Sequence, residues 1–219
     1  MSVSEFTVFL VDDDPAVLRG LARLMSAAHY RTRTFASPQE FLSAHDPGEP
    51  GCAVVDLAMP DLDGLELQQQ LHGAGIERPI IFVTGEADVP KTVRAMKAGA
   101  IDFLTKPVDA KALLAAVARA QALDSEARRA HDERTTANDG LAKLTRRERE
   151  VLVHVVAGRL NKQIAGDLGT VEKTIKVHRS RMMRKLGLRT VQDLMRFAER
   201  AGIRPQDPSA GPAPSPAYP

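Results

Sequence analysis

The chain has a single cysteine and no long apolar run, and each of these shortages excludes a class of protein. Cys52 is the only cysteine among 219 residues, which excludes an internal disulfide and a metal site built from several cysteines. Its place inside a strand-like run predicts a buried, inert thiol. No apolar stretch approaches the roughly 18 residues of a membrane span. The N-terminus also lacks the basic region followed by an apolar run that would suggest export. We therefore expect a cytoplasmic protein with no membrane partner.

Charge is distributed unevenly along the chain, although the formal net charge is only +2. Residues 1–123 carry 11 Lys and Arg against 16 Asp and Glu, a net charge of −5. Residues 124–219 carry 19 against 12, a net charge of +7. An acidic half with clustered aspartates indicates a cation as ligand, and a basic half indicates a polyanion as partner.

Composition and periodicity predict two domains. Residues 1–123 alternate five strand-like runs with five amphipathic helical patterns, which predicts an α/β fold, a (βα)5 doubly wound parallel sheet covered on both faces. Residues 140–204 predict a small all-α domain of four helices. Residues 124–139 hold almost no large apolar side chain and predict a linker, helical at first and looser from Thr135 to Gly140. Residues 205–219 are rich in Pro, Ala and Ser and predict a disordered tail.

Four short apolar runs in the acidic half each stop at a residue that can handle a phosphoryl group. They are Phe6–Val11 before Asp12 and Asp13, Cys52–Val55 before Asp56, Pro79–Val83 before Thr84, and Ile101–Leu104 before Lys106. Each run is rich in β-branched or aromatic residues, which is typical of a strand buried on both faces. Since ligands bind at the carboxyl edge of an open α/β sheet, we expect these polar side chains to converge there.

The residue types at this edge favour phosphoryl transfer. Three carboxylates in one place, Asp12, Asp13 and Asp56, repel one another unless a cation neutralises them or their pKa values rise. Oxygen ligands of this kind suit hydrated Mg²⁺. Asp56 can then act as the nucleophile, with the Lys106 ammonium and the metal screening the approach of two anions. The Thr84 hydroxyl can bind a phosphoryl oxygen.

These motifs together resemble the signature of bacterial response-regulator receiver domains, and the resemblance covers residues 6 to about 123. The matching motifs are Asp12-Asp13, Asp56-Leu57-Ala58-Met59-Pro60-Asp61-Leu62-Asp63-Gly64, Thr84-Gly85 and Lys106-Pro107.

The resemblance implies a role for each matched position. Asp56 would be phosphorylated by a sensor histidine kinase, and the acid pair with the backbone carbonyl of Ala58 would bind Mg²⁺ beside it. The Lys106–Pro107 bond would be cis. Phe103 would be an aromatic switch that turns inward once Thr84 bonds the phosphoryl group, although a simple core role for Phe103 stays open.

Other aspartates near the site have plainer interpretations. Asp14 is expected at a helix start, where a carboxylate is favourable near the helix dipole. Asp61 and Asp63 are expected to form the turn around Gly64, because Asp before Gly is ordinary turn chemistry.

The basic half predicts a helix-turn-helix. Thr145 and Glu148 form a capping box before an apolar stripe, Asn161 caps a short second helix, and a Gly169 turn leads to a helix over 171–186. One face of that third helix is cationic and the other apolar, which fits the major groove of DNA. The outward residues are Lys173, Lys176, Val177, Ser180, Arg181 and Arg184. Phosphates could be held by Lys162, Lys185 and Arg189.

Residues 141–204 resemble LuxR-type helix-turn-helix domains, so that the whole chain is similar to FixJ-type members of the FixJ/NarL response regulators. The resemblance rests on three segments, 144–152, 161–165 and 172–186. It implies base-facing positions at Lys173, Thr174, Lys176, Val177 and Ser180. Arg181 and Arg184 would serve the DNA backbone.

We therefore predict a transcriptional regulator of a two-component system that is not an enzyme. Phosphorylated on Asp56, it would form a homodimer and bind double-stranded promoter DNA, with RNA polymerase as a further possible partner. One alternative is a DNA-binding regulator whose receiver serves only as an unphosphorylated dimerisation module. An aspartyl phosphatase of the haloacid-dehalogenase kind is disfavoured, because Ala58 stands where such enzymes carry a second acid.

Overall fold

The computed structural model of the chain describes residues 5–85 and 89–203. It divides into two compact units, Met1–Arg128 and Arg129–Pro219, and each is described by itself. The segment 205–219, for which the sequence predicts a disordered tail, lies outside the described residues. No helix in the described ranges is long and apolar enough to cross a membrane.

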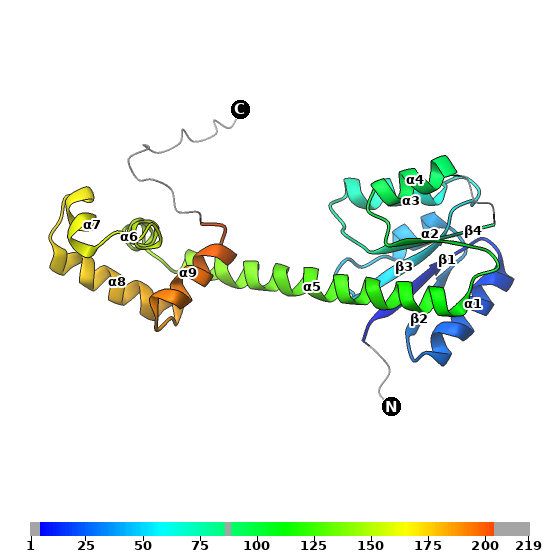
Figure 1. The fold of residues 1–219 in the computed structure, drawn as a ribbon, viewed down its shortest axis with the longest axis horizontal. Coiled ribbons are helices and arrows are strands. Elements are labelled where there is room, and N and C mark those ends of the chain that lie inside the picture. Colours follow the sequence, from blue (N-terminus) through cyan, green and yellow to red (C-terminus); the bar gives the residue numbers. More distant parts are fainter. Residues whose placement is uncertain (1–4, 86–88, 204–219) are drawn as a thin grey trace. The chain divides into compact units, whose positions relative to one another are not determined.

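The first unit is built on a five-stranded parallel sheet, which confirms the predicted α/β class (Figure 1). The strand order is β2-β1-β3-β4-β5, so the chain winds outward in both directions from β1, and the carboxyl ends of β1 and β3 lie side by side at the point of reversal. The strands are β1 (Thr7–Val11), β2 (Arg31–Phe35), β3 (Gly51–Asp56), β4 (Ile80–Thr84) and β5 (Asp102–Thr105).

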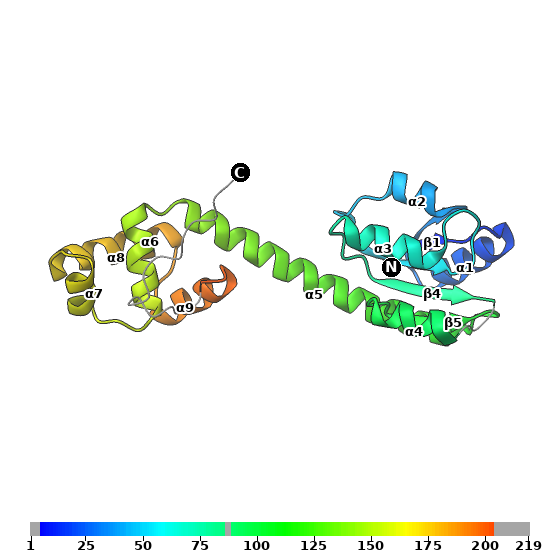
Figure 2. The same cartoon turned by 90° about the horizontal axis from the view of Figure 1, so that it is seen from above.

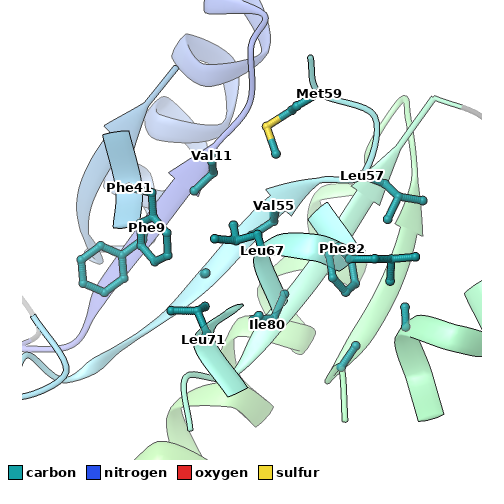
Figure 3. Packing of buried hydrophobic residues seen from close by; sticks show 14 of the residues in the cluster. Phe9, Val11, Phe41, Val55, Leu57, Met59, Leu67, Leu71, Ile80 and Phe82 are labelled. Atoms are coloured by element: carbon teal, nitrogen blue, oxygen red, sulfur yellow. The ribbon is translucent and has the colours of Figure 1, made fainter. Parts of the chain in front are cut away.

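Helices cover both faces of this sheet (Figures 1 and 2). Buried side chains of α1 and α5 pack on one face, and buried side chains of α2, α3 and α4 pack on the other. On the face covered by α2, α3 and α4, Phe9 lies against Phe41, with Val55 and Leu67 nearby (Figure 3). The helices are α1 (Pro15–Ala27), α2 (Pro38–Ala44), α3 (Gly64–Gly73), α4 (Val89–Lys97) and α5 (Ala110–Ala142).

The prediction that all four apolar runs are buried on both faces is correct for three of them. β1, β3 and β4 are buried at every residue, and Cys52 is a buried free thiol as expected. β5 is half-exposed instead. The physical reason is its place at the edge of the sheet, where it pairs with β4 alone.

The expected loose segment from Thr135 to Gly140 is wrong, because α5 continues as one helix to Ala142. Apart from Ala137, the residues of this segment are poor helix formers, so tertiary contacts hold it in the helix. Ala137 is 3% exposed. A Cβ added at Gly140 would lie 2.9 Å from the ring of Phe197, so glycine here permits close packing on α9 rather than a flexible joint.

Up to residue 203, where the described part of the chain ends, the second unit holds four further helices after α5. They are α6 (Arg146–Val156), α7 (Asn161–Asp167), α8 (Glu172–Leu186) and α9 (Val191–Arg200). Their inward residues, among them Leu152, Ile164 and Ile175, form one apolar cluster. The capping box at Thr145 is present as predicted.

One capping prediction in this unit is wrong. Leu160 is the N-cap of α7, and Asn161 is its first residue. The Asn161 carboxamide oxygen instead accepts a hydrogen bond of 3.2 Å from Arg179 on α8, so a contact between helices takes the side chain that local sequence would assign to the cap.

Candidate functional site

Three carboxylates meet at the carboxyl edge of the sheet. Asp12 and Asp13 follow β1, and Asp56 ends β3, so the parallel pairing of these strands brings them together. One carboxylate oxygen from each lies within 4.8 Å of the other two. Asp12 and Asp56 are 2% and 5% exposed, whereas Asp13 is exposed. The structure thus makes an acidic cluster that is mostly shielded from water and open on one side.

Lys106, beyond the end of β5, brings one positive charge to this cluster. Its Nζ donates a 2.8 Å hydrogen bond to Asp12 Oδ2 and lies 3.1 Å from Asp56 Oδ1. Asp12 Oδ1 in turn accepts the backbone N–H of Asp14 at 2.9 Å. Both oxygens of Asp12 are therefore engaged. By contrast, the buried Asp56 Oδ1 accepts no properly oriented hydrogen bond from the described residues.

The pKa values reflect this imbalance. Burial raises the pKa of Asp56 above its ordinary value; Lys106 opposes the rise, and the charges of Asp12 and Asp13 add to it. Burial alone would lower the pKa of Lys106, but its contacts with Asp12 and Asp56 outweigh burial and raise it. A further cation would relieve the excess negative charge. Oxygen ligands with one buried, unsatisfied acceptor fit Mg²⁺ well.

The other predicted receiver residues lie along the same edge. Thr84 ends β4, one residue beyond the partner of Asp56, and its carbonyl oxygen accepts the Lys106 N–H at 2.7 Å. Ala58 is exposed two residues after β3. Phe103 is half-buried on β5, opposite Phe82 and packed against the core. The Lys106–Pro107 bond is cis, as expected.

The loop from β3 to α3 confirms the plain interpretation of its aspartates. Asp61 adopts a left-handed φ of 65°, and Asp63 caps α3 in a capping box with Glu66. Sequence reasoning missed the role of Gly64. A Cβ there would lie 2.7 Å from the carbonyl oxygen of Asp56, so glycine allows α3 to start directly against the end of β3. Asp14 likewise caps α1, as expected.

In the second unit α8 has the expected two faces. Ile175 and Met182 are fully buried, while the predicted DNA-facing residues point outward. Thr174 is half-buried, and the exposed ones are Lys173, Lys176, Val177, Ser180, Arg181 and Arg184. A left-handed Gly169, with a φ of 61°, makes the turn that leads from α7 to α8. This is a helix-turn-helix with a cationic front.

Not every cation of α8 belongs to that front. Lys176 stays on the exposed front, although it pairs with Glu172 at 3.1 Å on the surface. Lys185, which the sequence offers as a phosphate contact, lies 2.6 Å from the buried carboxylate of Glu148 on α6. The sequence indicates Glu148 only as half of a capping box, because Lys185 lies 37 residues away and such a distant partner leaves no local pattern.

Comparison with known families agrees with both units. Residues 8–118 match the response regulator receiver domain, and residues 142–198 match the bacterial regulatory proteins of the luxR family.

Similar proteins cover nearly the whole chain. The response regulator protein TodT of Pseudomonas putida is 38% identical over 91% of this chain and 88% of its own length. The transcriptional regulatory proteins FixJ of Azorhizobium caulinodans and TdiR of Thauera aromatica are 40% and 41% identical over 91% and 95% of this chain, and 95% and 92% of their own.

Two solved structures are similar over the same extent. The response regulator StyR has 43% identity and a TM-score of 0.82, covering 90% of this chain and 100% of its own. Full-length FixJ from B. japonicum has 36% identity and a TM-score of 0.55, covering 90% and 98%.

Proposed function

Because this chain belongs to the two-component response regulators, transcriptional regulators that join a receiver domain to a LuxR-type DNA-binding domain, we propose that phosphorylation of Asp56 by a sensor histidine kinase switches it. The observation that carries this proposal is the buried Asp56 carboxylate, which has a raised pKa and shares the ammonium of Lys106 with Asp12. Such a group is held ready for an electrophile rather than used to stabilise the fold.

The transfer needs positive charge at the meeting point of two anions. An Asp56 oxygen forms a bond to phosphorus while the bond from phosphorus to the donor breaks, and the donor keeps the electron pair. Lys106 already lies within 3.1 Å of Asp56 and neutralises charge on the incoming group. Asp12, Asp13, Asp56 and the carbonyl of Ala58 would hold Mg²⁺, which supplies further electrostatic stabilisation of the transferring phosphoryl group.

Phosphorylation would act on the output through β4 and β5. The Thr84 hydroxyl binds a phosphoryl oxygen, and the half-buried Phe103 turns further inward. Phosphorylation adds about −1.5 to −2 charges to an acidic unit, which disfavours direct attraction of DNA, so the effect is conformational.

The conformational change would favour a homodimer. An apolar stripe on α4, made by Val89, Val93 and Met96, is exposed and supplies a surface for it. Ala95 on the same helix is fully buried in the core, so the exposed stripe and not the whole helix would form the contact.

Dimerisation would place two α8 helices on two half-sites of a promoter. Base edges would be read by Lys173, Thr174, Lys176, Val177 and Ser180, with Arg181 and Arg184 on the backbone; RNA polymerase is a further proposed partner.

The test compares Asp56→Asn with Asp61→Asn, a matched control at an exposed position in the loop that follows β3. Each protein is incubated with a small phosphodonor and Mg²⁺, then followed by intact mass, by sedimentation and by footprinting on a DNA duplex that the wild-type chain selects from a random pool. We expect wild type and Asp61→Asn to gain one phosphoryl group, dimerise and bind more tightly, and Asp56→Asn to do none of these.

Two other outcomes would contradict this proposal. If Asp56→Asn gained phosphate and bound DNA as well as wild type, the phospho-acceptor assignment would be wrong. If no protein responded to the phosphodonor but all dimerised and bound DNA, the receiver would be a dimerisation module that works without phosphate.

A further inference from the structure

The cations of α8 fall into two groups that the sequence does not separate. Lys173, Lys176, Arg181 and Arg184 are exposed on the front face. Arg179 and Lys185 reach across to other helices of the same unit, Arg179 to Asn161 on α7 and Lys185 to Glu148 on α6. Two side chains of the helix are therefore bound to the domain itself.

Glu148 is the centre of the tighter of these two contacts. It is 2% exposed, and its Oε2 accepts the Thr145 N–H at 2.8 Å and the Lys185 ammonium at 2.6 Å. One carboxylate thus closes the first turn of α6 and also binds the last turn of α8. A buried carboxylate without such partners would be costly, so the Lys185 ammonium is firmly held.

The titration of Glu148 agrees with this geometry. Burial by itself would raise its pKa, but the hydrogen bonds from Lys185 and Thr145 outweigh burial and hold the pKa below its ordinary value. The Lys185 side chain is 36% exposed, yet its charged end is engaged at hydrogen-bond distance.

We propose that Lys185 is a positioning residue of the DNA-binding domain and not a phosphate contact. Through Glu148 it fixes the carboxyl end of α8 on α6, and Arg179 fixes the middle of α8 on α7. These two contacts hold the rotation and tilt of α8 on the apolar core formed by Ile175 and Met182. The proposal rests on the proposed role of α8 in reading DNA.

Rotation and tilt matter because base readout is geometric. Hydrogen bonds to base edges need atoms within about 3 Å and in the correct direction. The exposed front of α8 gives DNA binding its charge, whereas the back of the helix decides where that charge points. Loss of Lys185 should therefore weaken specific binding without removing a cation from the DNA.

The salt dependence of binding distinguishes positioning from contact. Each lost phosphate contact reduces the slope of log K against log salt by about 0.9, and loss of a positioning residue leaves the slope unchanged. The test uses the full chain and a duplex selected by the wild-type chain from a random pool. The variants are Lys185→Gln, Glu148→Gln with Lys185→Gln, and the exposed control Arg181→Gln.

We expect Lys185→Gln to lower affinity about tenfold with an unchanged salt slope. The double variant should recover most of that loss, because it replaces the buried, unpaired carboxylate that Lys185→Gln leaves behind with a neutral amide. Arg181→Gln should reduce the slope by about 0.9. Circular dichroism and amide exchange check that each variant is folded, and the double variant remains informative if Lys185→Gln is not.

Two results would overturn the positioning role. One is a salt slope reduced by about 0.9 in Lys185→Gln, and the other is a double variant no tighter than the single one. If Arg181→Gln leaves the slope unchanged, the proposed DNA contact at Arg181 fails instead, and the recovery in the double variant still decides the role of Lys185.

Discussion

Each unit buries a carboxylate beside a lysine, and the two pairs behave in opposite ways. In the first unit Asp56 shares Lys106 with Asp12, and its pKa is raised, with burial as the largest cause. In the second unit Glu148 has Lys185 and a backbone N–H to itself, and its pKa is lowered despite burial. Both pairs consist of a carboxylate and an ammonium, but the ratio of carboxylates to cations in the two sites differs.

This ratio separates a reactive site from a structural contact. One ammonium among three carboxylates leaves negative charge that a metal ion or an electrophile can satisfy. One ammonium on one carboxylate, with a cap hydrogen bond added, leaves nothing to satisfy. Replacing a carboxylate by an amide should therefore change the stability of the two units in opposite directions.

The largest effect is expected for Glu148→Gln. Loss of the charge weakens both hydrogen bonds and leaves Lys185 without a counter-charge, so the free energy of unfolding of the second unit should fall by about 2–3 kcal/mol. Amide hydrogen exchange of the α6 and α8 backbone measures it. Glu199→Gln, at an exposed position on α9, is the control. Equal exchange in both variants would show that the Glu148 pair is not stabilising.

A smaller effect of opposite sign is expected for Asp56→Asn without metal. The neutral amide removes a carboxylate whose charged form the site disfavours, so the first unit should gain about 1 kcal/mol of stability. Added Mg²⁺ should stabilise the wild type, since binding to the folded state raises its stability, and should stabilise the variant much less. Thermal unfolding with Mg²⁺ or with a chelator measures both. Destabilisation by Asp56→Asn in the chelator would contradict the comparison.

The pH dependence of stability should also differ in sign. A raised folded pKa at Asp56 means that the folded state binds a proton more tightly, so this group lowers stability as pH rises from its ordinary pKa of 3.8 through the raised pKa. A lowered pKa at Glu148 contributes stability above its ordinary pKa of 4.5, and that stability is lost as pH falls through the folded pKa. The stability of each unit is measured by amide exchange between about pH 3 and 7. The difference between wild type and each amide variant then gives the contribution of Asp56 or Glu148 alone. Parallel differences would contradict the opposite shifts.

The smallest effect on stability is expected for Lys176→Gln. This lysine forms an exposed i,i+4 pair with Glu172, which contributes less than about 0.5 kcal/mol. If its ammonium lies at the DNA, its loss should nevertheless weaken duplex binding and reduce the salt slope by up to about 0.9. A stability loss as large as that of Glu148→Gln would show that exposure does not separate the two kinds of pair.

Much of the acid site could be predicted from sequence because its members come from strand ends. A strand buried on both faces is recognisable from its composition, and parallel pairing then forces Asp12, Asp56 and Thr84 to one edge. Gly64 could not be predicted in the same way. Its importance depends on the 2.7 Å that separates a Cβ from the carbonyl of Asp56, which is a property of packing.

The second unit shows the same limit. The 3.6-residue period predicts α8 and its outward face, whereas Lys185 is a candidate phosphate contact on charge alone. Only the fold brings it to Glu148. Local sequence likewise predicts Asn161 as a cap, yet its side chain is bound by Arg179, since a contact between helices competes with the local one.

The sequence by itself determined the two-part organisation, the strand and helix periods, the acidic cluster and the cationic helix, because each of these depends on residue type and spacing along the chain. Tertiary structure decided how charges are shared: that Lys106 serves two carboxylates, that Lys185 serves one, and that residues 135–140 are helical and packed. These outcomes depend on burial and on contacts between residues far apart in the chain, and no local pattern encodes them.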